Sequence, residues 1–270
     1  MMSNSTNNST SSTVLFTQQG SIGTLTFNRP DVYNAMNEEL IRAMRYVTAE
    51  MLASKTLRAV ILKGAGKAFL AGGDVGLFYR NRDTVAETVK PLGDVLHEGI
   101  KNIRNMPFPV IAQIHGACAG AGLSVAMAAD FAIAAEGAQF NTAYTKIGLS
   151  PDGGSTFFLP RYVGMKRAIE LIMLADSFDA TAAASMGVIN RAVPAEQLEQ
   201  EVAALAERLS NGATQAFARA KKLINQSFVT PIDKQLDDEI ANFSECAKTA
   251  DFKEGVTAFV EKRKPRFEGK

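Results

Sequence analysis

The stretch IHGACAGAGLSVAMAADFAIA, at Ile114–Ala134, decides the fold of this chain. A β-rich run at 110–115 ends in a loop that holds three glycines, and an alanine-rich helical segment follows. The stretch GAGKAFLAGGDVGLF (64–78) shows the same break after the β-rich run LRAVILK (57–63). Two loops that each open into a helix can direct main-chain N–H groups at one small anion. The pair therefore predicts a backbone oxyanion hole, which stabilises negative charge on a carbonyl oxygen.

The remaining sequence extends this alternation of strands and helices. Apolar periodicity and capping residues predict strands at 14–18, 22–28, 57–63, 109–115 and 130–134, and helices at 37–52, 84–105 and 122–129. Short connections between such elements indicate an α/β fold with largely parallel strands. Beyond about residue 195 only helices are predicted, at 195–209, 213–227, 232–248 and 251–262.

The chain accordingly divides into three parts. Residues 1–12, MMSNSTNNSTSS, have no apolar signal region and no basic start, so we interpret them as a disordered tail. Residues 13–195 form the predicted α/β core, and residues 196–270 form a helical region. The apolar faces of the predicted tail helices exceed what one flank of the core would cover, which favours association between copies of the chain.

Composition excludes several classes of protein. The chain has 270 residues, with 29 basic and 28 acidic residues that are well interspersed, which is unlike a nucleic-acid-binding protein. Its longest apolar stretches fall short of the ~20 residues of a membrane span. Two cysteines and two histidines exclude a disulfide framework and disfavour a metal site. We expect a cytoplasmic protein with no metal, no nucleic-acid partner and no membrane partner.

Taken alone, the second glycine loop is equally well explained by close helix packing. Six segments together point further: FNRPDVYNAMN (27–37), KAFLAGGD (67–74), HGACAGAG (115–122), FAIAAEGAQF (131–140), GLSPDGGSTFFLPRYVG (148–164) and VTAFVEKRKPRF (256–267). In these segments the chain resembles the crotonase superfamily of enoyl-CoA hydratases and isomerases, over about residues 13–270. The resemblance implies a crotonase-like spiral of ββα turns with a helical C-terminal trimerisation region. It also implies a homotrimer or a dimer of trimers.

The resemblance further implies an acyl-CoA thioester substrate and no separate cofactor, because coenzyme A enters as part of the substrate. By position, the oxyanion hole falls on the N–H groups of Gly73 and Ala121, the second of which is usually a glycine. The residues implied in substrate and coenzyme A binding are Val32, Tyr33, Ala35, Ala71, Gly72, Asp74, Val75, Gly120, Tyr144, Lys262 and Phe267. Lys262 and Phe267 belong to the tail and would act from the same or a neighbouring subunit. Asp31 replaces the usual lysine, which puts one phosphate contact in doubt.

The catalytic carboxylates depart from the hydratase pattern. Enoyl-CoA hydratases carry glutamates where this chain has Ser124 and Tyr144. Adding water across a double bond requires an acid/base pair close to the substrate, and neither replacement serves readily at neutral pH. The resemblance therefore disfavours plain hydration.

Asp152, in GLSPDGGS, is the candidate replacement base. Pro-Asp-Gly is also a strong turn signal in which the aspartate bonds to its own backbone, so a purely turn-forming role is the alternative. The segment is most similar to the 1,2-epoxyphenylacetyl-CoA and 3,2-enoyl-CoA isomerase group, which carries a matching Pro-Asp. Three phenylalanines are expected to surround Asp152 and raise the pKa of its carboxyl group, namely Phe140, Phe157 and Phe158.

His97 lies on the predicted helix 84–105 beside apolar residues, where a structural role is the default. Its position also resembles that of the histidine of 4-chlorobenzoyl-CoA dehalogenase, in which an aspartate matching Asp152 is the nucleophile. That enzyme has a tryptophan where this chain has Tyr144, which weakens the comparison. We interpret His115 as a residue that holds its loop in place.

These residues lead to one preferred function. An acyl-CoA isomerase would shift a double bond, or isomerise a ring, through a thioester enolate, with Asp152 as acid and base. The alternatives are a dehalogenase or hydrolase with Asp152 as nucleophile and His97 as base, an enoyl-CoA hydratase, and a non-catalytic protein that binds acyl-CoA.

Overall fold

The computed structural model describes residues 6–7 and 11–270. The expected disordered tail of residues 1–12 therefore falls largely outside the described residues. Thr6–Asn7 contradict that expectation locally, because they form a short strand, β1, that pairs antiparallel with β2 (Val14–Gln19). The reason is that β2 would otherwise be an edge strand with unpaired backbone groups.

A seven-stranded sheet with the order β1-β2-β3-β4-β5-β7-β10 forms the centre of the molecule. Its further strands are β3 (Ile22–Phe27), β4 (Ala59–Gly64), β5 (Val110–Ile114), β7 (Phe131–Ala135) and β10 (Arg191–Val193). The β2–β3 hairpin is antiparallel, and from β3 onward every pair is parallel. The predicted α/β fold with largely parallel strands is confirmed.

A small second sheet makes the chain a spiral. It contains β6 (Ala117–Ala119), β8 (Gln139–Asn141) and β9 (Phe178–Asp179). Strand β5 of the large sheet leads into β6 of the small one and then into helix α4 (Ala121–Ala128), and β7 leads likewise into β8. Each turn therefore places successive strands in different sheets, and the loops between them meet along one side.

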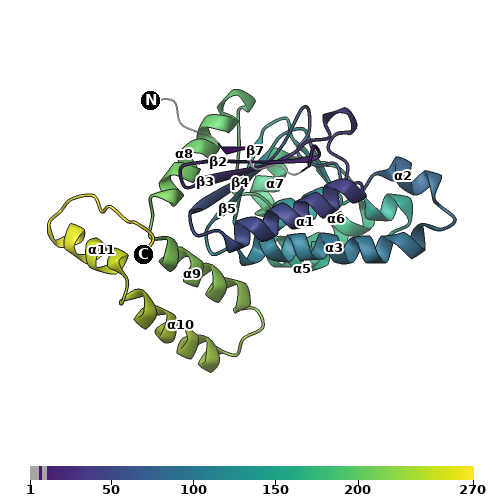
Figure 1. The fold of residues 1–270 in the computed structure, drawn as a ribbon. Coiled ribbons are helices and arrows are strands. Elements are labelled where there is room, and N and C mark those ends of the chain that lie inside the picture. Colours follow the sequence, from purple (N-terminus) through teal and green to yellow (C-terminus); the bar gives the residue numbers. More distant parts are fainter. Residues whose placement is uncertain (1–5, 8–10) are drawn as a thin grey trace.

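Helices cover both faces of the large sheet (Figure 1). On one face, α1 (Glu38–Ala53) and α3 (Val85–Asn105) pack against each other and contribute to the main apolar core, together with α4, whose residues are all buried. Helix α1 begins where the sequence predicts, because the Asn37 side chain accepts a hydrogen bond from the N–H of Leu40 at 3.0 Å. The remaining core helices are α2 (Val75–Arg80), α5 (Ser155–Val163), α6 (Met165–Leu174) and α7 (Ala180–Met186).

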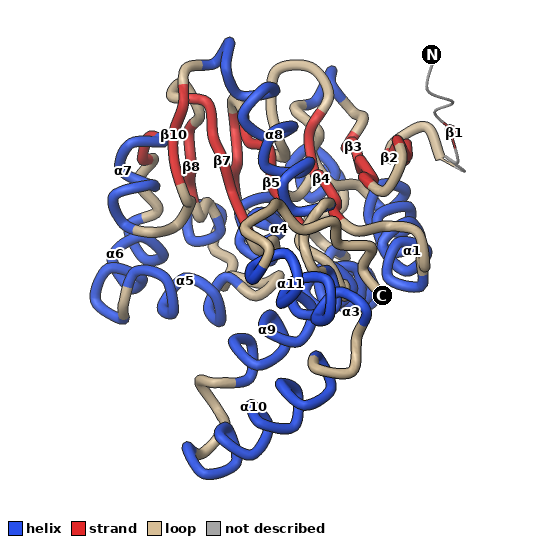
Figure 2. The backbone as a smooth tube through the Cα atoms, turned by 90° about the vertical axis from the view of Figure 1, so that its left-hand side faces the viewer, coloured by secondary structure: helices blue, strands red, loops and turns tan. Residues whose placement is uncertain are grey.

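Helix α8 (Leu198–Ser210) covers the opposite face of the sheet (Figure 2). Its buried Val202 and Ala206 share an apolar cluster with Ile111 and Ile133 of the central strands. Helix α8 therefore packs on the core, although it lies in the region 196–270 that the sequence assigns to the helical part of the chain. A helical period shows that a segment has an apolar face but not which surface covers it.

The projecting tail consists of α9 (Thr214–Gln226), α10 (Ile232–Cys246) and α11 (Ala250–Val260), as Figure 1 shows. Lys221 of α9 ties it to the core, because its ammonium lies 2.7 Å from the carboxylate of Asp130 in a mostly buried ion pair. After α11 the chain returns to the sheet, where Arg58 donates to the carbonyl oxygens of Gly212 and Phe267. None of the helices in the described part of the chain is long and apolar enough to cross a membrane.

Candidate active site

The two glycine loops pack directly against each other. Leu70, after β4, bridges to Cys118 of β6, and the N–H of Phe69 donates to the carbonyl of His115 at 2.8 Å. A side chain at Gly122 would place its Cβ 1.9 Å from the carbonyl oxygen of Leu70. Only glycine permits this close approach. The same contact therefore accounts for close helix packing and also brings the two loops together.

The predicted oxyanion donors lie on neighbouring backbone. Gly72 has φ +89°, and a Cβ added there would lie 2.8 Å from the Ala119 carbonyl oxygen and 3.5 Å from the Ala121 nitrogen. Gly120 takes a positive φ of 51° as the cap of α4, so Ala121 begins the helix without the left-handed backbone that would strain an alanine. The first N–H groups of a helix have no partner within it. Ala121 therefore presents a free donor despite the replacement of glycine.

Gly73 presents its N–H from the other loop. Met36 forms a parallel bridge with Gly73, in which the N–H of Met36 donates to Gly72 and the N–H of Asp74 donates to Met36. This pairing uses the groups on either side of Gly73 and leaves its own N–H directed away from Met36. The structure thus brings together the two loops that carry the predicted oxyanion hole.

The residues implied in coenzyme A binding lie on two adjoining segments. Ala71 donates to the carbonyl of Tyr33, and the buried side chain of Asn34 donates to the carbonyls of Ala65 and Ala68. Three of the predicted binding residues remain exposed around this junction, namely Val32, Tyr33 and Val75. A surface next to the oxyanion loops is therefore available for a nucleotide.

Asp74 acts on the loop itself. Its carboxylate accepts from the N–H of Leu77 at 3.1 Å, which caps α2, and pairs with Arg29 at 3.3 Å. A carboxylate with these partners fixes the position of Gly73 next to it. In the same way, His115 bonds through Nε2 to the carbonyl of Gly66 at 3.0 Å, as expected for a residue that holds its loop.

Asp152 lies in a corner built from hydroxyl groups. Its Oδ1 accepts a hydrogen bond of 2.7 Å from the phenol of Tyr144, and its carbonyl oxygen accepts from the Ser124 hydroxyl at 3.2 Å. Ser124 is also hydrogen-bonded to the hydroxyl of buried Ser155 at 2.7 Å. The Asp152 carboxylate bonds to Tyr144 rather than to the backbone of its own turn, which is unlike the turn-forming alternative.

The phenol of Tyr144 is held in its protonated form. Burial raises the pKa of Tyr144 well above its ordinary value, and the charge of Asp152 raises it further. The phenol is therefore the donor of the 2.7 Å bond at any pH near neutrality. Its backbone lies in a short helical turn at Tyr144–Ile147, after strand β8.

His97 contacts the same corner from α3. The N–H of Gly153 donates to its Nε2 at 3.2 Å, so the proton of a neutral imidazole lies on Nδ1. The resemblance to 4-chlorobenzoyl-CoA dehalogenase pairs His97 with Asp152, but it does not predict this hydrogen bond to Gly153. The structure thus brings the His97 ring to Gly153, the residue that follows Asp152. One of the two ring nitrogens already accepts a hydrogen bond there.

The turn after Asp152 packs closely against the buried side chain of Ser124. Gly153 has φ +60°, and a Cβ there would lie 2.9 Å from Cβ of Ser124 and 3.3 Å from Ile100. A longer side chain at 124 must displace this turn. The small side chain of Ser124 thus fits the close approach of the Gly153 backbone, which a glutamate at this position would disturb.

The expected phenylalanine environment of Asp152 is only partly present. Phe158 is buried and its ring lies against Gly154. Phe140 instead stacks on Phe178 with ring centroids 5.6 Å apart, and Phe157 is 43% exposed under the guanidinium of Arg161. Phe140 and Phe157 therefore each pack against a partner in their own sheet or helix.

The tail residues Lys262 and Phe267 lie away from this corner within one subunit. Phe267 packs near Gly255 of α11 and accepts a hydrogen bond from Arg58 at the start of β4, at the opposite end of that strand from the Gly73 loop. Lys262 follows α11, which Figure 1 shows at the far side of the molecule from α2. A contribution to the site from either residue requires a neighbouring subunit.

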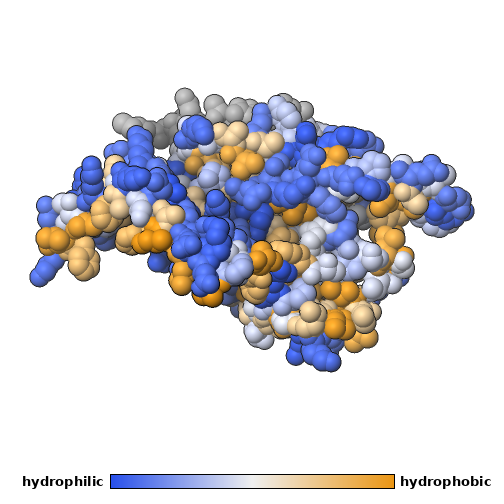
Figure 3. All heavy atoms as spheres, turned by 90° about the horizontal axis from the view of Figure 1, so that it is seen from below, coloured by the Kyte–Doolittle hydropathy of each residue, from blue (hydrophilic) through white to orange (hydrophobic). Residues whose placement is uncertain are grey.

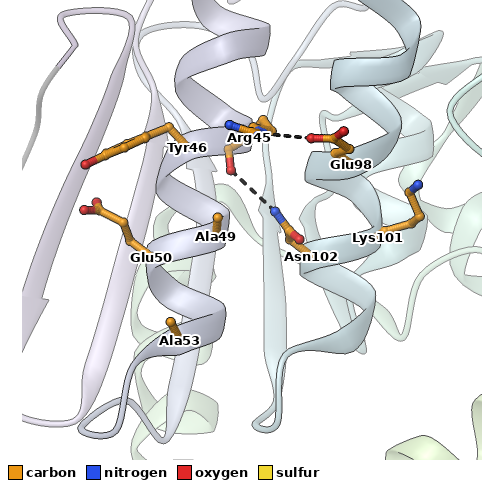
Figure 4. Close-up of a pocket in the computed structure, with 8 residues that line it drawn as sticks. All are labelled: Arg45, Tyr46, Ala49, Glu50, Ala53, Glu98, Lys101 and Asn102. Atoms are coloured by element: carbon orange, nitrogen blue, oxygen red, sulfur yellow. Dashed lines mark hydrogen bonds and ion pairs between the residues drawn. The ribbon is translucent and has the colours of Figure 1, made fainter.

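The groove between α1 and α3 is a different feature (Figure 4). It has a volume of about 700 Å³ and is lined mainly by polar side chains that already have partners. Arg45 pairs with Glu98 at 2.8 Å, and Asn102 donates to the Arg45 carbonyl at 3.4 Å. None of the predicted site residues lines this groove. No cluster of three or more His, Cys, Asp or Glu side chains suited to a metal occurs among the residues that the structure describes.

Sequence reasoning missed two features of the corner. Ser155 lies three residues beyond Asp152, and its N–H donates to the Asp152 carbonyl at 3.1 Å. Tyr144 was assigned to substrate binding, whereas its hydroxyl bonds to the predicted base. The serine that follows the Pro-Asp-Gly-Gly turn could have indicated the contact of Ser155 with Asp152. Nothing in the spacing of residues 144 and 152 predicts the hydrogen bond between their side chains.

Comparison with known proteins agrees with this geometry. The sequence pattern of the family described as enoyl-CoA hydratase/isomerase matches residues 17–270. This chain belongs to the enoyl-CoA hydratase/isomerase family. The resemblance to the crotonase superfamily is thereby confirmed, as is the fold, and the chain is an enzyme of hydratase/isomerase type.

Relatives within the family carry both kinds of name. The chain is 41% identical over 255 residues to a probable enoyl-CoA hydratase of Rhodobacter capsulatus, with 92% of this chain and 95% of that protein covered. It is 34% identical to the 1,2-epoxyphenylacetyl-CoA isomerase of Escherichia coli, with 92% and 95% covered. An enoyl-CoA hydratase structure from Polaromonas superposes with a TM-score of 0.90 at 33% identity, over 94% of this chain and 99% of that one. Names alone do not separate hydration from isomerisation.

Proposed function

We propose that this enzyme is an acyl-CoA isomerase that moves a double bond, or isomerises a ring, through a thioester enolate. The observation that carries the proposal is the corner around Asp152, where hydroxyl groups stand in place of both hydratase glutamates and one carboxylate remains. Helix α4 connects the two halves of the site, because its first turn contains both Ala121 and Ser124. The relatives named as isomerases support this choice.

The chemistry needs one carboxylate and two backbone donors. Asp152 removes a proton from the α-carbon of a 3-enoyl thioester, and the electron pair left on that carbon moves onto the carbonyl oxygen. The N–H groups of Gly73 and Ala121 bind this enolate oxygen, and one such donor is worth about 3–4 kcal/mol of barrier. The protonated Asp152 then returns the proton to the γ-carbon, so the double bond becomes conjugated and the carboxylate is regenerated.

The hydratase alternative lacks a second acid/base group. Addition of water needs one group to take a proton from water and another to deliver one to the α-carbon. Ser124 and Tyr144 offer hydroxyls that stay protonated near neutral pH, and they are bonded to Asp152 and Ser155. Hydration is therefore expected to be slow.

The dehalogenase or hydrolase alternative requires His97 to accept a proton from water. Its Nε2 already accepts the Gly153 N–H at 3.2 Å, and only rotation of the ring would free it. We propose that His97 holds the turn that carries Asp152. A non-catalytic binding protein is disfavoured by the close packing that preserves both oxyanion loops.

The assay follows directly from these alternatives. Purified enzyme is incubated separately with a 3-enoyl-CoA and a 2-enoyl-CoA, and the products are identified by their mass and by the ultraviolet absorbance of a conjugated thioester. Isomerisation gives a conjugated thioester of unchanged mass, hydration adds one water, and hydrolysis releases free coenzyme A. A water adduct forming as fast as the conjugated product would reject the proposal.

We also propose that the enzyme assembles as a trimer or a dimer of trimers. Many large apolar side chains of the tail are exposed in the single chain, among them Ile224, Phe228, Ile240, Phe243, Phe252 and Phe259. Figure 3 shows apolar side chains gathered along the tail and on the adjacent underside of the core. Surfaces of this kind are usually buried between subunits.

Light scattering at micromolar concentration is expected to give three or six times the 29.0 kDa mass of the chain. Replacing exposed apolar residues of α10, as in the double variant Ile240→Glu and Phe243→Glu, is expected to lower this mass. The double variant Asp233→Asn and Asp237→Asn is the control on the same helix. An active monomer would contradict both the assembly and any role of Lys262 or Phe267 at a neighbouring site.

A further inference from the structure

We infer that Tyr144 is the positioning residue of Asp152, fixing which carboxylate oxygen takes and returns the proton. The inference rests on the proposed function of Asp152 as acid and base. Tyr144 occupies a position where hydratases carry a catalytic glutamate. In this chain the tyrosine would position the base instead of acting as one.

The hydrogen bond itself has the geometry of a strong contact. The phenol oxygen of Tyr144 lies 2.7 Å from Oδ1 of Asp152, within the range of hydroxyl-to-carboxylate bonds. An ionised carboxylate has no proton to donate, so the phenol supplies the hydrogen. Burial and the neighbouring negative charge both raise the pKa of Tyr144, which keeps the phenol protonated near neutral pH.

The phenol is itself held in place. Ser124 lies with its hydroxyl 3.4 Å from the phenol oxygen, and Ser124 in turn bonds to Ser155 at 2.7 Å. The carbonyl oxygen of Asp152 accepts from the Ser124 hydroxyl and from the Ser155 N–H, and the Tyr144 phenol oxygen lies 3.3 Å from it. Side chain and main chain of Asp152 are therefore fixed by the same group of hydroxyls.

This arrangement leaves the two carboxylate oxygens unequal. Oδ1 is bonded to Tyr144, whereas Oδ2 has no protein partner among the hydrogen bonds of the described residues. Among the described residues, the titratable side chains that hydrogen-bond to residues 152 and 153 are the Tyr144 phenol and the His97 imidazole, and the imidazole accepts the Gly153 N–H. Oδ2 is thus the oxygen available to substrate, and a carboxylate held at Oδ1 needs no rotation between removing a proton and returning it.

The test compares Tyr144→Phe with Tyr162→Phe. Tyr162 is a matched control, because its phenol is also largely buried but donates to the carbonyl of Met127 at 2.8 Å and does not contact Asp152. For Tyr144→Phe, kcat is expected to fall roughly tenfold to a hundredfold, the scale of a hydrogen bond to a charged group. The acid limb of the kcat profile is expected to move to higher pH, because the carboxylate loses a donor. Tyr162→Phe is expected to leave both kcat and the pH of the acid limb unchanged.

A shape-preserving substitution covers the case in which Tyr144→Phe fails to fold. Incorporation of 3-fluorotyrosine at position 144 makes the phenol a stronger donor, and the acid limb is expected to move to lower pH, opposite to Tyr144→Phe. An unchanged acid limb in the folded variants would overturn the inference. Asp152→Asn separates the two claims, since full activity of that variant would instead overturn the proposed function.

Discussion

The two halves of the site are built from different parts of the chain. The proposed oxyanion half consists of main-chain N–H groups on two loops, which glycines allow to touch each other, as at Gly72 and Gly122. The proton-transfer half consists of side chains, and there this chain differs from hydratases at Ser124 and Tyr144 while adding Asp152. Backbone donors survive side-chain replacement, as Ala121 illustrates. One half can therefore keep its charge-stabilising task while the other changes the reaction.

The largest effect is expected when the Asp152 carboxylate is removed, because this disables the proton-transfer half and leaves the oxyanion half intact. Asp152→Asn is expected to lower turnover by roughly 10²–10⁴, the scale of acid/base catalysis. Coenzyme A affinity is expected to stay near normal, because the oxyanion loops do not depend on this side chain. Steady-state kinetics and calorimetric binding measure the two quantities, with exposed Asp176→Asn as the control. Retained turnover would return Asp152 to a turn-forming role.

The reverse experiment disturbs the backbone half. In Gly122→Ala the added Cβ would lie 1.9 Å from the Leu70 carbonyl oxygen, so α4 and its Ala121 donor must shift. Turnover is expected to fall roughly 10²–10³, as for loss of an oxyanion donor, and overpacking is expected to cost about 1–3 kcal/mol of the free energy of unfolding. Kinetics and denaturant unfolding provide the measurements. Gly137→Ala, which meets open space at an ordinary φ, is the matched control. Equal behaviour of the two variants would show that the loop contact does not set the site.

The smallest expected effect comes from restoring hydratase residues. The double variant Ser124→Glu and Tyr144→Glu is expected to gain little hydration of 2-enoyl-CoA, because Gly153 occupies the space beside position 124. Two added carboxylates would also be buried near Asp152, which costs free energy unless they become protonated. The rate of water addition is compared with that of the native enzyme. Hydration at a rate that rivals isomerisation would mean that the two side chains alone determine the reaction.

Sequence reasoning predicted the backbone half better than the side-chain half. The glycine breaks and the strand–loop–helix pattern predicted where β4, β5 and α4 lie, because these depend on local chain conformation. The short elements β6, β8 and β9 were missed, since two or three residues give no measurable period. The packing of α8 on the sheet could not be predicted, because an amphipathic period does not reveal which surface covers the apolar face of a helix.

The side-chain half depends on contacts between segments that local patterns do not encode. His97 and Gly153 meet across 56 positions of sequence, and the Tyr144–Asp152 bond depends on how two irregular segments pack. The sequence leads us to expect Phe140 among the apolar surroundings of Asp152, and the structure stacks its ring on Phe178 of the neighbouring strand. Only the identity of the unusual residues, not their partners, could be predicted.

The central claim is that one carboxylate moves one proton between two carbons of the substrate. It is tested by supplying a 3-enoyl-CoA that carries deuterium at the α-carbon and locating the label in the product by mass spectrometry. We expect a conjugated thioester of unchanged composition with deuterium transferred to the γ-carbon, and no transfer in Asp152→Asn. A product that has gained water, or a γ-carbon that carries only solvent hydrogen, would contradict it.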